Sequence, residues 1–113
     1  MANNTLRIAG KTSFIAVTAT SSTSIQVAPT TPDNVSFAAF LNIGTKPCAI
    51  NISSLATAPA AVYPAAGTPG DYVLPANMIV PIVLSVPQTQ FSVTAVCGGS
   101  DTTTLLVTPV ENQ

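Results

Sequence analysis

The chain has 113 residues, of which 6% are charged, and its formal net charge is −1. It contains no histidine, three basic and four acidic residues, which excludes imidazole chemistry and a basic surface for nucleic acid. Hydrophobic residues make up 47% of the chain, which excludes a disordered chain. We therefore expect one folded domain over residues 1–113 that is not an enzyme and binds no cofactor and no metal.

Alternation of side chains with a period of two predicts strands throughout the chain. In chain order, the predicted strands cover residues 6–8, 13–20, 24–28, 35–43, 48–53, 71–74, 80–86, 91–97 and 103–110. In the segment 35–43, Val35, Phe37, Ala39, Leu41 and Ile43 share one face, and Ser36, Ala38, Phe40 and Asn42 share the other. Serine and threonine alternate with apolar residues in several strands, so we expect them on the solvent side.

The connections between these strands are rich in proline and glycine. Residues 44–47 predict a tight hairpin that joins the two clearest strands antiparallel. Residues 87–90 and 98–101 are expected to close two further hairpins, and 55–61 and 64–71 are expected to form loops. Pro81 inside a strand pattern indicates an edge strand or a bulge.

About eight short strands separated by regular breaks predict an all-β fold in a single domain. The expected architecture is an antiparallel β-sandwich of jelly-roll or Greek-key type, and the pattern leaves the strand order open.

Neither a membrane segment nor an export signal is expected. The longest apolar run, residues 78–84, is short and contains Pro81, and the N-terminus lacks a basic start. We therefore expect no membrane partner and assembly in a cytoplasm. There Cys48 and Cys97 are expected to be buried thiols, although a bridge formed later stays open.

A surface with so little charge is unusual for a free monomer and suits a subunit that buries much of its exterior in an assembly. Residues 1–12 are a candidate extended arm, and the loop before residue 72 can also reach a neighbour. The candidate interface residues are Asn4, Leu6, Arg7, Ile8, Tyr63, Asp71 and Tyr72. The simpler interpretation of Asp71 is a turn aspartate that caps a backbone amide.

Four C-terminal segments form a recognisable series: 70–76 (GDYVLPA), 80–84 (VPIVL), 91–96 (FSVTAV) and 104–110 (TLLVTPV). Together with 40–48 (FLNIGTKPC), they resemble the plan of small structural proteins of tailed bacteriophages, over residues 35–110. The members best described are head decoration proteins, also called cement or staple proteins.

This resemblance implies a compact β-sandwich, often a jelly roll, on the outer surface of an icosahedral capsid. Its partners would be the major capsid protein and further copies of itself, as a homodimer or homotrimer at two-fold or three-fold positions. The implied role is non-enzymatic bridging of capsid subunits in a DNA-filled head. The alternative is a tail, spike or fibre domain of a virion that binds the host surface, and a copy number of only a few per particle would favour it.

Overall fold

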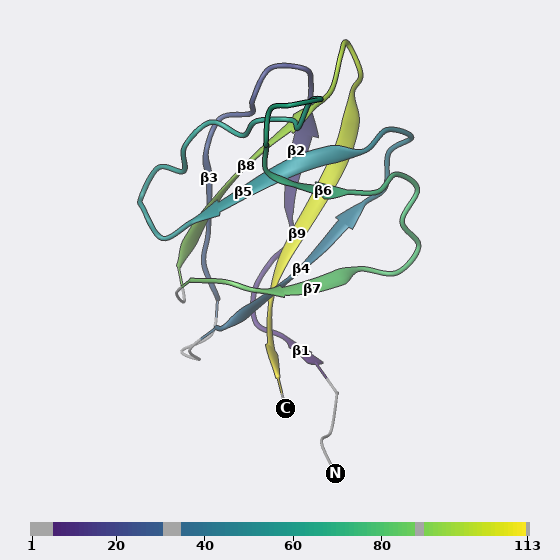
Figure 1. Ribbon diagram of the computed structural model, residues 1–113. Helices are drawn as coiled ribbons and strands as arrows, with labels where there is room; N and C mark the ends of the chain where they lie inside the picture. The colour runs from purple at the N-terminus through teal and green to yellow at the C-terminus, as the bar shows by residue number, and fades with distance from the viewer. Residues whose placement is uncertain (1–5, 31–34, 88–89, 113) are drawn as a thin grey trace.

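The computed structural model describes residues 6–30, 35–87 and 90–112, which form strands and no helix (Figure 1). The strands are β1 (Leu6–Ile8), β2 (Ser13–Val17), β3 (Ile25–Val27), β4 (Phe37–Asn42), β5 (Cys48–Ser53), β6 (Tyr72–Leu74), β7 (Ile82–Ser85), β8 (Phe91–Cys97) and β9 (Thr103–Asn112). The predicted all-β, antiparallel sandwich is confirmed, with each expected strand present and most of them one to three residues shorter or longer than the pattern suggested.

The strands form two sheets that pack face to face. Sheet A has the order β1-β9-β4-β7, with β2 also paired to β9, and sheet B has the order β3-β8-β5-β6. Pairing is nested along the chain: β2 pairs β9, β3 pairs β8, β4 pairs β7 and β5 pairs β6, all antiparallel. This nesting is the strand order of a jelly roll, so the structure decides between the two alternatives left open by the sequence.

The predicted hairpins at 44–47, 87–90 and 98–101 are wrong. Each of these segments carries the chain from one sheet to the other, since β4, β7 and β9 lie in sheet A whereas β5 and β8 lie in sheet B. A run of turn residues indicates that the chain changes direction, but it does not indicate which strands pair with each other. In a sandwich, crossing to the opposite sheet lets consecutive strands bury their apolar faces against each other.

The core lies between the two sheets. Its largest fully buried side chains include Phe40, Leu105 and Ile15 from sheet A and Phe91 and Leu74 from sheet B. Pro81 directly precedes β7, which is the last strand of sheet A. The expectation of an edge strand at this proline is therefore confirmed.

The face of β4 that lies in the core is the less apolar of its two faces. Ala38, Phe40 and Asn42 point into the core and are fully buried, whereas Phe37 and Leu41 lie on the outer side and are partly exposed. The more apolar face of this strand is therefore the outer one.

Residues 54–64, called the strap below, cross the outer face of sheet B (Figure 1). The hydroxyl of Ser92 donates to the carbonyl oxygens of Leu55 and Ala56, each at 2.9 Å, and that of Thr94 donates to the Pro59 carbonyl at 2.7 Å. Both hydroxyl residues are buried. The expectation that serine and threonine face solvent is wrong for these two, because their hydroxyl groups satisfy the strap backbone.

Candidate interaction surfaces

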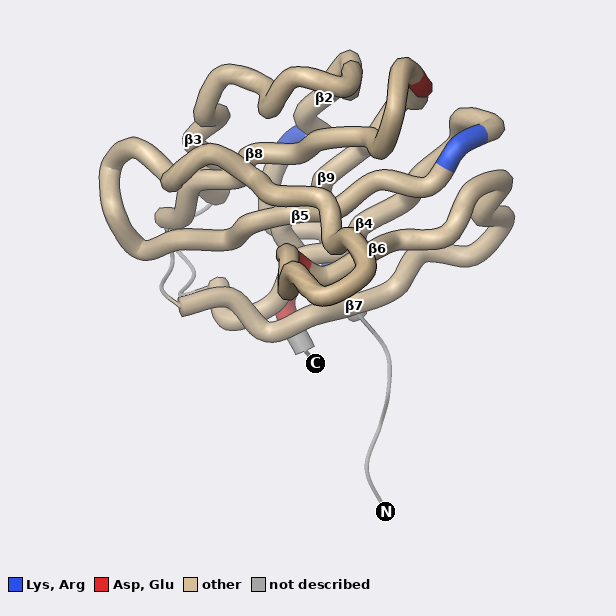
Figure 2. Tube along the Cα trace, turned by 45° about the horizontal axis from the view of Figure 1, so that its top comes forward, with Lys and Arg blue, Asp and Glu red and all other residues tan. Residues whose placement is uncertain are grey.

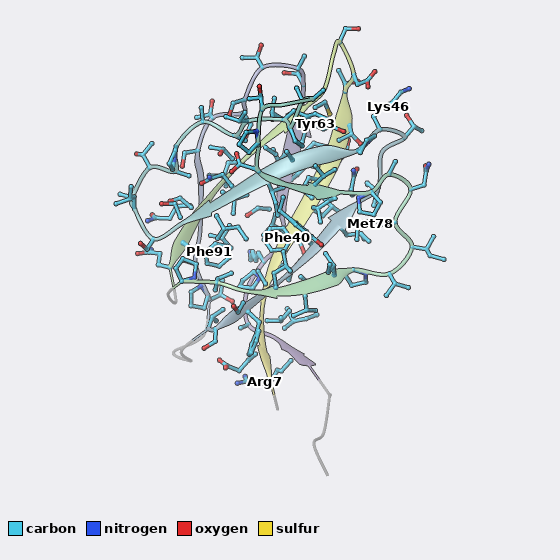
Figure 3. All side chains as sticks on the ribbon, in the orientation of Figure 1. Arg7, Phe40, Lys46, Tyr63, Met78 and Phe91 are labelled. Atoms are coloured by element: carbon cyan, nitrogen blue, oxygen red, sulfur yellow. The ribbon has the colours of Figure 1, made fainter. Side chains whose placement is uncertain are left out.

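The structure separates the predicted interface residues into two groups. Leu6, Arg7 and Ile8 form β1 and pair with the end of β9. Tyr63 lies in the strap, Asp71 directly precedes β6, and Tyr72 is the first residue of β6. Arg7 and Tyr63 lie at opposite ends of the molecule (Figure 3). Asn4 lies outside the described residues. These residues therefore do not make one continuous site.

Asp71 links the C-terminal part of the strap to β5. Its Oδ2 accepts a hydrogen bond from the Val62 amide at 2.7 Å, and its Oδ1 accepts one from Asn51 Nδ2 at 3.1 Å. The Asp71 amide donates back to the Val62 carbonyl at 2.8 Å. The neighbouring Gly70 is required here, because a Cβ would overlap the backbone of Pro64. Both carboxylate oxygens are thus occupied within the chain, which fits a structural role.

The two tyrosines differ in accessibility. Tyr63 packs with Val73 on the small cluster formed by Ala49, Ala61 and Val96, on the outer face of sheet B. Its ring also lies against Gly98, where an added Cβ would come within 3.0 Å. Tyr72, by contrast, is exposed on β6, the edge strand of sheet B. Of this group, Tyr72 is the side chain that offers free surface to a partner.

The described charged residues are few and scattered (Figure 2). Arg7 and Glu111 face each other in register between β1 and β9. Lys46 lies in the β4–β5 connection and Asp101 in the β8–β9 connection. The described residues thus offer no concentrated charge for a strongly charged ligand.

Cys48 and Cys97 are register partners on β5 and β8, and both are buried free thiols. Burial raises the pKa of Cys48 to about 12, with a further contribution from the nearby Cys97. The pKa of Cys97 is raised as well, by burial and then by Asp101. Thiols held in the protonated form are poor nucleophiles, so these two serve as core side chains in the structure.

Several large apolar side chains that sequence reasoning did not select are exposed. Phe14 on β2 is 63% exposed, Leu55 on the strap 62%, and Ile79 before β7 94%, with Val80 beside it also exposed. The sequence did contain a signal for part of this surface. Because the segment 35–43 has large apolar side chains on both faces, Phe37 and Leu41 on one and Phe40 on the other, some of them must lie outside the core of a two-layer sandwich.

No family model, curated protein or solved structure matches this chain. Among the described residues, no helix is long and apolar enough to cross a membrane. Within the same ranges, no three side chains of the metal-binding types gather into a group that could hold a metal ion.

Proposed function

We propose that this chain is a non-enzymatic structural protein of a tailed bacteriophage virion that decorates the outer surface of the icosahedral head. In this role it bridges subunits of the major capsid protein and stabilises the DNA-filled shell. The observation that carries the proposal is a small jelly roll with very little charge and with large apolar side chains on its surface. Jelly rolls are a recurrent architecture among viral capsid proteins.

The chemistry of the surface supports a permanent protein partner. Phe14, Ile79 and Val80 expose apolar area whose burial is favourable. A partner surface that covers them has few charges to desolvate on this chain. Binding of this kind favours broad, static contact between proteins over recognition of a small charged ligand.

Stabilisation of the head follows from mass action. A subunit that binds the expanded shell and not the disassembled capsid protein stabilises the shell by its binding free energy at every site. The proposed partners are the major capsid protein and further copies of this chain, as a dimer or a trimer. Nucleic acid and membranes are not proposed as partners, and assembly is proposed to occur in the host cytoplasm.

The test is co-sedimentation of the purified protein with capsid shells that lack it, followed by heating of the decorated shells. The proposal predicts saturable binding at a copy number comparable to that of the major capsid protein, and a higher melting temperature of the shell. Absence of binding would overturn it. A protein that is found at a few copies on purified virions would instead support the tail, spike or fibre role.

A shortened chain tests the proposed contribution of the N-terminus to shell binding. Deletion of residues 2–8 removes β1 but leaves β2 paired with β9, so the sandwich should persist. If the N-terminus contacts the shell, this variant binds more weakly than the full chain. Equal binding by the two chains would remove the N-terminus from the proposed capsid contact without affecting the rest of the proposal.

A further inference from the structure

The outer face of sheet A carries apolar side chains, and the exposed ring of Phe14 on β2 is one of them. The corresponding face of sheet B carries the strap and the cluster around Ala49, Ala61 and Val96. Among the described residues, no comparable hydrophobic cluster forms on the outer side of sheet A. The chain thus covers one outer face with its own loop and leaves the other open.

The pairing register arranges this open face in rows. Residues directly opposite each other in a sheet share a face, so Phe14, Leu106 and Leu41 form a row across β2, β9 and β4. All three side chains point away from the core, because their neighbours Ile15, Leu105 and Phe40 are buried in it. This row is the centre of the outer face.

Two further rows extend the face toward the end of β9. Thr108 and Ala39 lie in register with Val83 on the edge strand β7. Beyond them, Val110 is buried between its register partners Ile8 and Phe37, of which Phe37 is partly exposed. Ile8 is 71% exposed. The apolar surface therefore runs from β1 and β2 across β9 and β4 to β7.

The charge of this face restricts what can cover it. The strands β2, β4 and β7 and residues 103–110 of β9 contain no lysine, arginine, aspartate or glutamate. A partner charge placed against the centre of the face would lose its hydration without finding a counter-charge. The occupant must therefore present an uncharged and nearly flat apolar surface of its own.

We propose that this occupant is a second copy of the chain, bound through the same outer face of sheet A. A two-fold dimer places identical patches against each other, so an uncharged face necessarily meets an uncharged face. Two sheets can pack in this way with a spacing of about 10 Å, as they do inside β-sandwiches. The proposal deepens the self-association named under the proposed function and rests on that part of it alone.

The size of the face indicates which class of interface such a dimer would form. Four strands about 4.8 Å apart and roughly 20–25 Å long present roughly 450 Å² per copy. Two copies would bury roughly 900 Å², which is below the about 1,200 Å² at which stable specific interfaces begin and is in the range of weak, transient ones. We therefore expect a reversible dimer in solution that is reinforced where many copies are held close together on an assembly.

The experiment is sedimentation velocity of the purified full-length protein over a range from about 1 µM to about 1 mM, which spans weak and moderate dissociation constants. The wild-type chain should shift from monomer to dimer as its concentration rises. Phe14→Asp should raise the dissociation constant at least tenfold, because each copy would bury an unpaired carboxylate. Leu55→Asp is the matched control, since Leu55 has nearly the same exposure on the opposite side of the molecule, and it should dimerise like the wild type.

Ala16→Lys gives a second, independent variant, because Ala16 is an exposed position on the same outer face and should tolerate a long side chain. Circular dichroism and thermal melting establish that each variant is folded. A wild-type chain that remains monomeric overturns the proposal, whatever its binding to shells. A dimer that persists in folded Phe14→Asp and Ala16→Lys assigns self-association to another surface. If the wild-type chain is monomeric and both variants lose binding to shells, the outer face of sheet A binds the capsid protein instead of a second copy.

Discussion

Asn42 is the polar side chain on which three segments of the chain converge. It is fully buried, and its Nδ2 donates to the Lys46 carbonyl at 2.9 Å. Its Oδ1 accepts from the Gly44 amide at 3.2 Å and from the Thr103 hydroxyl at 2.7 Å. The Asn42 carbonyl also accepts from the Met78 amide. This single residue therefore joins the β4–β5 connection, the start of β9 and the β6–β7 connection.

Asn42→Ala should lower the free energy of unfolding by about 2–4 kcal/mol, because it removes three hydrogen bonds and leaves the buried Thr103 hydroxyl without its acceptor. Urea denaturation followed by circular dichroism measures the change. Asn51→Ala is the matched control, because the side chain of Asn51 is only partly buried and bonds to Asp71. Its expected loss is about 1 kcal/mol. Equal losses for the two variants would contradict the role assigned to Asn42.

Because the pKa of the Cys48 thiol is raised, we expect the free energy of unfolding to fall in alkaline solution. This pKa lies at about 12 in the folded chain, against an ordinary value of 9.0. Between these values the unfolded chain releases the proton and the folded chain keeps it, so stability is complete below pH 9 and declines as the pH rises. The decline approaches about 1.4 kcal/mol per pH unit for this one thiol.

Urea denaturation of the wild type and of Cys48→Ala at several pH values from 8 upward measures this decline. The difference in unfolding free energy between the two proteins removes the contributions of lysine and tyrosine titration. That difference should become smaller above pH 9. A difference that is constant with pH would show that Cys48 is not protonated preferentially in the folded state.

The strap is an element without regular secondary structure that is nevertheless fixed at several points. Its carbonyl groups accept hydrogen bonds from Ser92 and Thr94. In addition, the Ala58 amide donates to Ser24 Oγ and the Ala61 amide donates to Ser21 Oγ, both at 2.9 Å. Ala58 and Ala61 are buried. The strap therefore acts as a partial third layer on sheet B.

Thr94→Val should loosen the strap while it preserves most of the side-chain volume. The lost hydrogen bond to the Pro59 carbonyl is worth about 1 kcal/mol, and deuterium uptake of the strap amides should increase. Hydrogen exchange with mass spectrometry of peptides covering residues 55–62 measures the uptake. Thr23→Val, at an exposed position, serves as the control. Unchanged uptake in Thr94→Val would mean that packing alone holds the strap.

The strand elements could be predicted from the sequence, because the period-two pattern is a local property. Residues 48–53 and 91–97 coincide with β5 and β8. Strand partners could not be predicted, because the same turn residues serve a hairpin and a crossing between sheets. The sequence also did not determine which face of β4 lies in the core, because each face carries apolar residues: Ala38 and Phe40 on one, and Phe37 and Leu41 on the other. Only the position of Asn42 over its polar partners shows why the less apolar face is inside.

The predicted interface depended on the assumption that loops and termini are free to reach outward. For Asp71 the assumption conflicts with its two hydrogen bonds inside the chain, and Tyr63 is packed on sheet B. Ile8 and Tyr72 are exposed as the assumption required. The outer face of sheet A was missed because its residues come from strands distant in sequence, and only the pairing register brings them together.

The molecule as a whole has too few charges to bind a partner mainly by electrostatic attraction. Seven charged residues are spread over the whole sequence, and those in the described ranges are dispersed around the sandwich (Figure 2). Ionic strength screens charge pairs at the surface but leaves the burial of apolar area intact. The dependence of the affinity on salt concentration therefore distinguishes binding through charges from binding through buried apolar area.

The affinity of the protein for capsid shells should change less than threefold between about 0.05 M and about 1 M sodium chloride, a range over which the Debye length falls to about 3 Å. Lys46→Ala should bind like the wild type at both ends of this range, because Lys46 is an isolated charge in an exposed turn. Co-sedimentation at the two salt concentrations measures both quantities. An affinity that falls by tenfold or more in high salt would mean that the few charged residues carry the contact. In that case the apolar surface of the sandwich would not be the part of the molecule that holds it on the shell.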